Sequence, residues 1–494
     1  MEKRTKIVAT ISDKRCDEDF IRSLYQAGMN AVRINSAHVT TDSAMRIVEN
    51  VRRVSDSIAI IIDTKGPEIR LTAMAESAGE GIPVAVGDRL RIHGTAEGTP
   101  CTLEALYMND PTFVRDVPIG ASVLIDDGEI ELVIVGKDDG ELVGEVKNPG
   151  VIRSHKSVNI PGVVIDLPSI SKKDREFILW AIDNDLDFIA HSFVRTREDV
   201  LEVKKIIHEY NSPIKIISKI ENKEGVDNID EILHVTYGVM VARGDLGVEI
   251  PAEKIPVVQR YIVRKCIESK TPVIIATQML HTMITNPRPT RAEVSDVANA
   301  IYERVDAVML SGETASGDYP VESVATMTKV AEEIERDNTH NMPFIDMNMV
   351  GINNEITAQL ARSAVRATIN IPVKAILIDT LTGRTGRYLS AFRGSKPVYA
   401  LCYRKSVMRR LALSYGVFPM HRDADWPQGG FLLDLLTYLQ QARLLGKEDQ
   451  VVVVGGSFGA ARGASYMEIG SVTNLERKAQ LTLPASEAPI PSVF

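Results

Sequence analysis

The chain has 494 residues, more than one hydrophobic core holds, so several domains are expected. Hydrophobic residues make up 44% and charged residues 25%, which excludes an intrinsically disordered protein. With 57 basic and 66 acidic residues the net charge is −9, so bulk charge attracts neither nucleic acid nor an anionic membrane.

A cytoplasmic protein is expected. No apolar run is long enough to span a membrane, and the first residues, Met1 to Lys6, lack the apolar core of a signal peptide. The four cysteines are widely scattered and form no CxxC pair, which suits a reducing compartment and argues against a disulfide scaffold or a cysteine zinc cluster.

The first strands are predicted at Lys6–Ile11, Ala31–Ser36 and Ile58–Lys65, separated by helical periodicity at Asp17–Gly28 and Asp42–Val54. Each run is apolar throughout rather than alternating, as is typical of parallel strands buried on both faces. These residues, 1–69, are predicted to be the first part of a catalytic barrel.

A segment of different character follows, at about Leu71 to Asp166. Turn signals at Asp126-Asp127-Gly128 and Asp138-Asp139-Gly140 bracket the alternating run Glu129–Val135. Residues 70–166 are therefore predicted to form a small inserted β-barrel domain over the mouth of the main barrel, where it can act as a lid.

Five more apolar runs then alternate with helix-like connectors. With the first three they make eight strand–helix units, the number that closes a (β/α)8 TIM barrel, with 167–341 as its second part. A doubly wound open sheet also alternates in this way, but eight units fit closure better. The five runs are Phe188–Phe193, Ile214–Glu221, Val239–Arg243, Val273–Gln278 and Ala307–Ser311.

A separate C-terminal α/β domain is predicted at 342–483, followed by an irregular tail at 484–494. Its boundary is placed at Asn338–Asn348, which includes Pro343 and shows no periodicity. The expected elements are a helix at Glu355–Thr368, a strand at Ala375–Thr380, a helix at Arg387–Phe392, a strand at Val398–Tyr403, a helix at Ser406–Leu413 and a strand at Gln450–Gly455.

Polar residues stand where six of the eight barrel strands end. One such end is explained by solvated loops, but six of eight indicate a reactive site at the carboxyl ends of the strands. The residues are Arg33 and Asn35; Asp63, Thr64 and Lys65; Lys219 and Glu221; Arg243, Gly244 and Asp245; Thr277 and Gln278; Ser311 and Glu313.

Lys219 and Glu221 share one face of a strand, and by themselves they are better explained as a structural ion pair. Asp245, at the end of the next strand, can converge with Glu221. Two carboxylates and substrate oxygens suit Mg²⁺, which keeps few protein ligands. The turn from Gly244 to Gly247 offers backbone amides to an anion, or is an ordinary loop.

Three further cations come from separate places: Arg33, and Arg70 and Lys156 at the two ends of the insert. Each alone is more simply a solvated surface charge. Closing the insert would bring Arg70 and Lys156 toward the barrel mouth, as phosphoryl transfer requires. The chain has no GxxxxGK[ST] loop, so a nucleotide is not held in P-loop fashion.

Several long strings resemble the pyruvate kinase family, in order along nearly the whole chain. They are Ile62-Asp63-Thr64-Lys65-Gly66-Pro67-Glu68-Ile69-Arg70, Ile217-Ser218-Lys219-Ile220-Glu221-Asn222, Met240-Val241-Ala242-Arg243-Gly244-Asp245-Leu246-Gly247, Ala276-Thr277-Gln278-Met279-Leu280, Asn286-Pro287-Arg288-Pro289-Thr290-Arg291-Ala292-Glu293 and Met309-Leu310-Ser311-Gly312-Glu313-Thr314-Ala315.

The resemblance implies transfer of the phosphoryl group of phosphoenolpyruvate to ADP, giving pyruvate and ATP. It implies Mg²⁺ or Mn²⁺ on Glu221 and Asp245, and charge stabilisation by Lys219. The other implied roles are catalysis by Thr277 and Arg33, substrate binding by Arg33, Lys219, Gly244, Asp245, Thr277 and Ser311, and nucleotide binding by Asn35, His38, Arg70 and Lys156.

The resemblance also implies K⁺, held by Asn35, Asp63 and Thr64. Ala37 replaces the serine that supplies a further ligand in the family, so a water must fill that position. Glu68 matches potassium-using members, whereas independent members commonly carry lysine there. K⁺ is therefore expected to activate, with weakened affinity.

In the C-terminal domain, Thr380, Thr382, Gly383, Arg384 and Thr385 resemble a loop that binds a phosphorylated effector. A turn that caps the following helix explains these residues equally well. The later glycine loop, Gly455 to Gly463, lacks the proline usual in the family. A homotetramer is implied by the resemblance alone.

Two other functions remain open at this point. A Schiff-base aldolase would use Lys219 with a lowered pKa, which the nearby Glu221 opposes. A catalytically dead metabolite sensor would be expected to have lost Lys219, Glu221 or Asp245, and all three are present.

Overall fold

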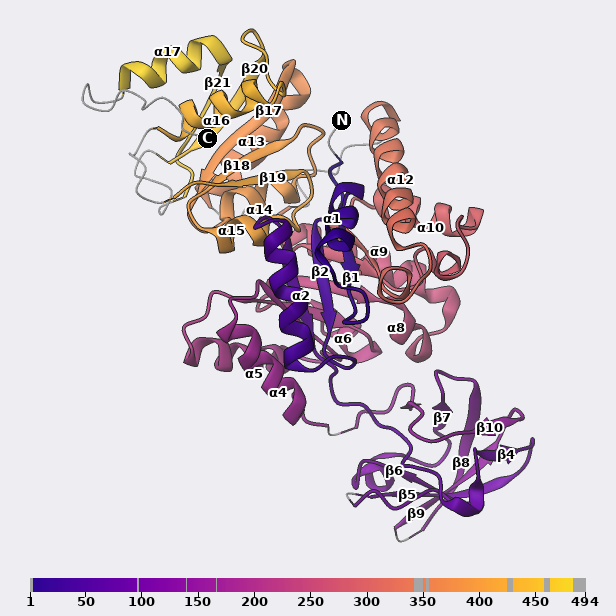
Figure 1. The fold of residues 1–494 in the computed structure, drawn as a ribbon. Coiled ribbons are helices and arrows are strands. Elements are labelled where there is room, and N and C mark those ends of the chain that lie inside the picture. Colours follow the sequence, from indigo (N-terminus) through magenta and orange to yellow (C-terminus); the bar gives the residue numbers. More distant parts are fainter. Residues whose placement is uncertain are drawn as a thin grey trace.

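The computed structural model describes residues 3–95, 97–138, 140–165, 167–341, 350–351, 355–423, 430–456 and 463–482. Three parts lie in a row, with a strand-rich insert at one end, a barrel in the middle and a C-terminal domain at the other end (Figure 1). Among the helices of these ranges, none has the length and apolar character needed to cross a membrane.

The central part is a closed barrel of parallel strands in the order β1-β16-β15-β14-β13-β12-β3-β2. This confirms the predicted (β/α)8 barrel. Although one strand begins at Gly238, a residue before the predicted run Val239–Arg243, each predicted run coincides with one of the barrel strands. They are β1 (Lys6–Thr10), β2 (Ala31–Asn35), β3 (Ala59–Asp63), β12 (Phe188–His191), β13 (Lys215–Ile220), β14 (Gly238–Ala242), β15 (Val273–Ala276) and β16 (Ala307–Leu310).

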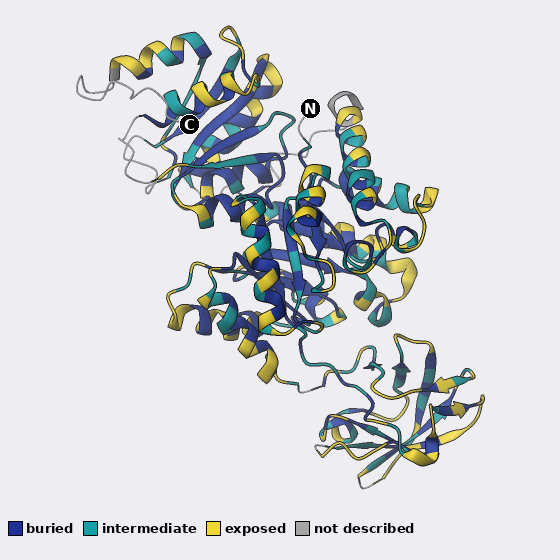
Figure 2. Ribbon diagram, in the orientation of Figure 1, coloured by how far each residue is buried: buried dark blue, intermediate teal, exposed yellow. Residues whose placement is uncertain are grey.

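The strands are apolar throughout because both of their faces are buried (Figure 2). Side chains such as Val8, Ile61 and Phe188 fill the inside of the barrel, while neighbours such as Ile7 and Ile62 pack outward in the large core shared with the helices. Neither face needs polar residues, so alternation is absent.

Helices cover the outside of the barrel. They are α1 (Glu18–Ala27), α2 (Thr41–Val54), α4 (Lys172–Asp183), α5 (Arg197–Glu209), α6 (Lys223–Asp227), α7 (Ile229–Leu233), α8 (Arg243–Glu249), α9 (Ile255–Glu268), α10 (Arg291–Tyr302), α11 (Gly312–Ala315) and α12 (Pro320–Asn341), with 3-10 turns at Ala252–Lys254 and His281–Ile284.

One helix start also shapes the barrel mouth. Ser171 and Asp174 form a capping box at α4. The Asp174 Oδ1 atom accepts a second set of hydrogen bonds, from the amides of Lys65 (2.9 Å) and Gly66 (3.3 Å). The turn that follows β3 is therefore held to the start of α4.

The insert has its own hydrophobic core and consists of a six-stranded and a two-stranded sheet. The amide of Leu71 donates to the carbonyl of Lys156 (3.0 Å), and the amide of Val158 donates to the carbonyl of Ile69 (2.9 Å), so the two connecting segments run as a pair. The elements are Glu76–Ala78 (3-10), β4 (Ile82–Val84), β5 (Arg89–Gly94), β6 (Ala105–Met108), α3 (Phe113–Asp116), β7 (Ser122–Ile125), β8 (Ile130–Asp138), β9 (Glu141–Val146), β10 (Gly150–Ile152) and β11 (Val158–Asn159).

The C-terminal domain is a sheet in the order β19-β18-β17-β20-β21 with helices around it, as predicted in class. The predicted boundary reaches into α12 and then, like the tail 484–494 and most of the glycine loop, into residues outside those described. The elements are α13 (Ile356–Asn370), β17 (Val373–Thr380), α14 (Arg384–Ala391), β18 (Val398–Cys402), α15 (Lys405–Leu411), β19 (Val417–His421), α16 (Phe431–Gln441), β20 (Gln450–Gly455), β21 (Tyr466–Ser471) and α17 (Val472–Thr482).

This domain closes the barrel end opposite the insert. Ala412 and Leu413, which follow α15, join the core inside the barrel. Beside them, the buried Arg393 guanidinium pairs with Asp306 through Nη2 and Oδ2 (2.5 Å) and through Nη1 and Oδ1 (2.7 Å). The floor of the barrel is thus built by two domains.

Candidate active site

Lys219 stands at the centre of the barrel mouth, near the end of β13. Its Nζ atom lies 3.0 Å from Asp63 Oδ1, 2.9 Å from Glu221 Oε1 and 2.7 Å from Ser192 Oγ. Lys219 is only 8% exposed, and an ammonium has three donors, so these contacts account for all of them. The ammonium is therefore held in one position.

The charge of Lys219 is fixed as firmly as its position. Burial alone would lower the pKa of Lys219, but the Asp63 and Glu221 carboxylates outweigh it and raise that pKa above its usual value. A Schiff-base lysine needs the opposite shift, toward the neutral amine. The geometry therefore argues against the aldolase alternative.

Arg33, on β2, lies beside this lysine through a shared carboxylate. Its Nε atom is 2.5 Å from Asp63 Oδ2, and its Nη1 atom donates to Thr10 Oγ (3.2 Å). Burial opposes ionisation of Asp63, but Arg33 and Lys219 hold the pKa of Asp63 below its usual range. Two cations thus flank one buried carboxylate.

Ser192, just after β12, is a central residue that the sequence reading missed. Its hydroxyl accepts from Lys219, donates to the carbonyl of Thr64 (2.6 Å) and lies 3.3 Å from Asp63 Oδ1. The predicted strand Phe188–Phe193 contains it, but no charged residue stands at the end of that strand, so the sequence does not single it out. A serine at a barrel strand end was the only available signal.

Two carboxylates converge on the other side of Lys219. Burial raises the pKa of Glu221 to about 7, against the opposing effect of Lys219, and burial also raises the pKa of Asp245. The Glu221 Oε2 atom accepts from the amide of Phe193 (2.7 Å), which fixes its orientation. Two adjacent carboxylates that are hard to ionise together fit a divalent cation, which would relieve their repulsion.

Thr277 is held against the start of α8. Its Oγ1 atom accepts from the amide of Gly244 (2.8 Å). Thr277 has a φ of 68°, a left-handed conformation that is an outlier for a β-branched residue and costs on the order of 1–3 kcal/mol. The Arg243 guanidinium pairs with the Asp296 carboxylate (2.8 and 2.7 Å), so its charge is already neutralised within the protein.

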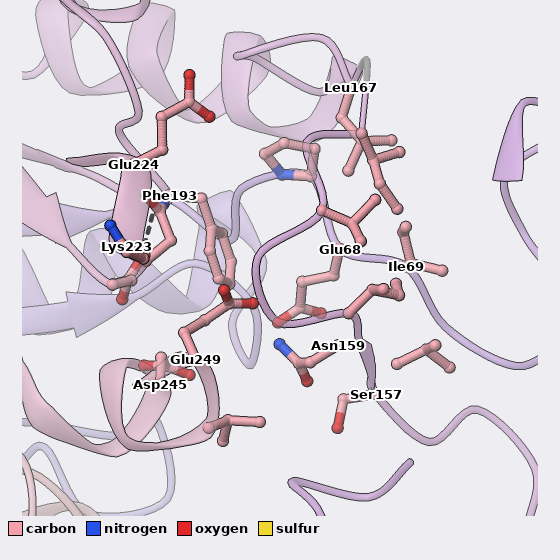
Figure 3. Close-up of a pocket in the computed structure, with 18 of the residues that line it drawn as sticks. Glu68, Ile69, Ser157, Asn159, Leu167, Phe193, Lys223, Glu224, Asp245 and Glu249 are labelled. Carbon is pink, nitrogen blue, oxygen red and sulfur yellow. Dashed lines mark hydrogen bonds between the residues drawn. The ribbon is translucent and has the colours of Figure 1, made fainter. Parts of the chain in front are cut away.

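A cleft of about 670 Å³ lies between the barrel mouth and the two connecting segments of the insert. Figure 3 shows Asp245 and Glu249 on one wall, opposite Glu68, Ile69 and Asn159. Arg70 and Lys156 line the same cleft as Glu221 and Asp245.

Both insert cations already have partners in this cleft. Arg70 Nε lies 2.6 Å from Glu68 Oε2, and its Nη1 atom donates to the carbonyl of His155 (2.8 Å). Lys156 Nζ lies 2.7 Å from Asp126 Oδ2. A polyanion entering the cleft would have to compete with these carboxylates.

Other predicted residues lie apart from this network. Asn35 pairs in register with Asp63, but its Oδ1 atom accepts from the amide of Ala37 (3.1 Å). His38 is exposed. The amide of Ser311 donates to Glu313 Oε2 (2.8 Å), while the Ser311 hydroxyl is buried without a partner.

The predicted effector residues lie in the C-terminal domain, away from the barrel mouth (Figure 1). Thr380 Oγ1 accepts from the amide of Gly383 (2.9 Å), and Thr382 Oγ1 accepts from the amide of Arg384 (3.4 Å). Thr385 is buried. These contacts organise the turn before α14, so the hydroxyls serve the backbone here.

Comparison with known proteins agrees with this geometry. Residues 2–324 match the family model "Pyruvate kinase, barrel domain", and residues 358–469 match "Pyruvate kinase, alpha/beta domain". A pyruvate kinase of Borreliella burgdorferi is 44% identical over 477 residues, covering 96% of this chain and 98% of the relative. One from Geobacillus stearothermophilus is 41% identical, covering 97% and 82%.

A solved structure gives the same result. The crystal structure of a pyruvate kinase from Cryptosporidium parvum superposes with a TM-score of 0.89 at 34% sequence identity. The match covers 95% of this chain and 96% of that one. The similarity therefore includes the barrel, the insert and the C-terminal domain together.

Proposed function

This chain belongs to the pyruvate kinase family, and from that premise we propose how its own residues carry the reaction. The enzyme transfers the phosphoryl group of phosphoenolpyruvate to ADP, giving pyruvate and ATP, in the last step of glycolysis. Such transfer depends on positioning and on stabilising charge rather than on covalent chemistry by the protein. The site must therefore concentrate fixed cations around the transferring group.

Glu221 and Asp245 are the proposed ligands of Mg²⁺ or Mn²⁺. Both line the cleft, and burial raises the pKa of each, as expected of a carboxylate pair that needs a cation. A bound divalent ion supplies neutralisation of phosphoryl oxygen charge and a template for both substrates. Two protein ligands leave the remaining positions for substrate and water.

Lys219 is proposed to stabilise negative charge on the transferring phosphoryl group and on the enolate that forms when this group is transferred. Arg33, held by Asp63 and Thr10, would bind the substrate phosphate from the neighbouring strand. Gly244, Asp245 and Thr277 would position the carboxylate end of the substrate.

Two assignments at the same mouth complete this group. Thr277 is proposed to deliver a proton to the enolate, directly or through water, and Ser311 is proposed as a further substrate contact. Among the described residues the buried hydroxyl of Ser311 has no hydrogen-bond partner, which supports this role.

The nucleotide is proposed to lie against the insert. Arg70 and Lys156 line the cleft. Asn35, at the end of β2, and His38, in the loop after it, are proposed as further nucleotide contacts. Binding of ADP would replace the contacts of Arg70 with Glu68 and of Lys156 with Asp126 by contacts with phosphate oxygens. Both cations would then neutralise charge on the transferring side.

K⁺ is proposed to bind Asn35, Asp63 and Thr64, which supply oxygens from adjacent strand ends. Ala37 offers no hydroxyl there, so a water would complete the shell, at a cost of up to about 2 kcal/mol of immobilisation entropy. K⁺ is expected to activate with a high half-saturating concentration. Equal rates with K⁺ and with tetramethylammonium at constant ionic strength would contradict this assignment.

Three further assignments complete the proposal. A phosphorylated effector would bind the loop from Thr380 to Thr385, with Arg384 as the cation that pairs with its phosphate. If no phosphorylated sugar or nucleotide shifts the phosphoenolpyruvate saturation curve, the loop is better explained as a turn that caps the following helix. A homotetramer is proposed, supported by exposed apolar side chains on α9 at Val257 and Tyr261, and sedimentation tests it. Cytoplasmic location remains part of the proposal.

The observation that carries these roles is the set of contacts that holds the Lys219 ammonium. Asp63, Glu221 and Ser192 take up its three donors, and Glu221 also belongs to the carboxylate pair proposed to bind the metal. The direct test measures pyruvate formation from phosphoenolpyruvate and ADP with Mg²⁺, in Lys219→Met, Glu221→Gln and Thr277→Val. Native turnover in all three variants would refute the assignment of the site.

A further inference from the structure

Ser192 connects two parts of the site, as the Asp63 carboxylate also does. Its hydroxyl contacts the lysine proposed to stabilise the phosphoryl group, and also the Thr64 carbonyl proposed to bind K⁺. The residue is 1% exposed, so no water competes for these contacts from outside.

The donor and acceptor roles in this chain of contacts are fixed by chemistry. A serine hydroxyl carries one proton. The hydroxyl donates this proton in a hydrogen bond to the Thr64 carbonyl oxygen at 2.6 Å rather than to Asp63 Oδ1 at 3.3 Å, because the shorter contact is the stronger one. Lys219 must then donate to Ser192 Oγ across 2.7 Å, because an ammonium has no acceptor. The order of donation is Lys219 to Ser192 to Thr64.

The backbone holds Ser192 so that it cannot drift. Its amide donates to Thr64 Oγ1 (3.1 Å), which makes the contact between these two residues reciprocal. Gly66, at φ 75°, packs so closely that a Cβ there would stand 2.9 Å from Ser192 Cβ. Only glycine permits this approach.

We propose that Ser192 is a positioning residue that couples occupancy of the monovalent cation site to the placement of the Lys219 ammonium. The inference rests on the proposed roles of Lys219 and Thr64 and adds a link between them. Asp63 also contacts Lys219 and is itself a proposed K⁺ ligand, but its other oxygen pairs with Arg33. The Ser192 hydroxyl contacts Lys219, Thr64 and Asp63, and no other partner is found for it among the described residues.

The test compares Ser192→Ala with Ser218→Ala. Ser218 is a buried serine on β13 whose hydroxyl donates to Thr236 Oγ1 (2.9 Å), away from the lysine side of the strand. Ser192→Ala is expected to lower kcat on the order of 10- to 100-fold, since misplacement by about 1 Å costs up to that much. KM for phosphoenolpyruvate should change far less, and Ser218→Ala should leave both constants near native.

The cation arm uses binding as well as rate. Half-saturating K⁺ should rise about 3- to 10-fold in Ser192→Ala, the effect of one lost hydrogen bond. Equilibrium dialysis of Tl⁺, a K⁺ substitute, should show the same weakening without turnover. Ser192→Cys, whose thiol is a weaker donor and acceptor, should give intermediate values and covers the case in which alanine prevents folding.

The outcomes separate this inference from the assignments beneath it. A native chain that K⁺ neither activates nor binds would overturn the potassium site and the coupling together. A native chain that needs K⁺, with Ser192→Ala matching Ser218→Ala in kcat and in Tl⁺ affinity, would overturn the coupling alone. A rise in KM with kcat unchanged would also overturn it, because that pattern reports ground-state binding.

Discussion

Replacing Lys219 by methionine removes the central charge of the site while keeping a side chain of similar length. Unit charges about 4 Å apart at an effective dielectric constant of about 20 attract by about 4 kcal/mol. If this attraction acts on the transition state alone, its loss lowers kcat by about 1000-fold. The burial of Lys219 and its three fixed contacts support using the full value.

The assay is steady-state pyruvate formation with saturating Mg²⁺ and K⁺, giving kcat and the KM for phosphoenolpyruvate separately. We expect kcat to fall and KM to stay within a few-fold, because the lost interaction belongs to the transition state. Lys215→Met is the matched control, since Lys215 stands at the opposite end of the same strand. A Lys219→Met variant within tenfold of native kcat would refute the reasoning.

Three further expectations follow from the same structure. Asp306→Ala should destabilise the chain by about 3–5 kcal/mol, because it leaves the buried Arg393 guanidinium unpaired, and an unchanged urea midpoint would contradict this. Mn²⁺ affinity, measured by electron paramagnetic resonance, should fall as the pH is lowered through about 7, because burial raises the pKa of Glu221 to that value and the protonated acid does not bind the metal. Asp245→Asn should weaken Mn²⁺ binding at every pH. Ala37→Ser should lower the half-saturating K⁺ concentration by restoring one oxygen, and an unchanged value would exclude a missing ligand.

The barrel could be predicted from sequence because strands buried on both faces leave long apolar runs that few other structures produce. β19 and β21 were missed for the converse reason. Both are edge strands of the C-terminal sheet in which all residues but one are only partly buried, and their mixed composition resembles that of loops.

The site was predictable where it carries charge. Lys219, Glu221 and Asp245 stand in regular positions at strand ends, so the barrel geometry alone brings them together. Ser192 could not be distinguished from any other strand-end serine without the positions of its partners. The positive φ of Thr277 was equally hidden, because glycine rather than threonine is the residue that signals such a conformation.

The barrel interior is completed by residues of the C-terminal domain, which the ribosome makes last. The ribosome finishes the eighth strand at Leu310 well before it adds Leu413, the side chain that completes the interior at that end. A nascent barrel therefore exposes an apolar opening, and Asp306 lacks its Arg393 partner, until the last third of the chain arrives. Truncation after α12 should give an aggregating fragment rather than an autonomous enzyme, so the C-terminal domain is expected to be required for folding of the catalytic barrel.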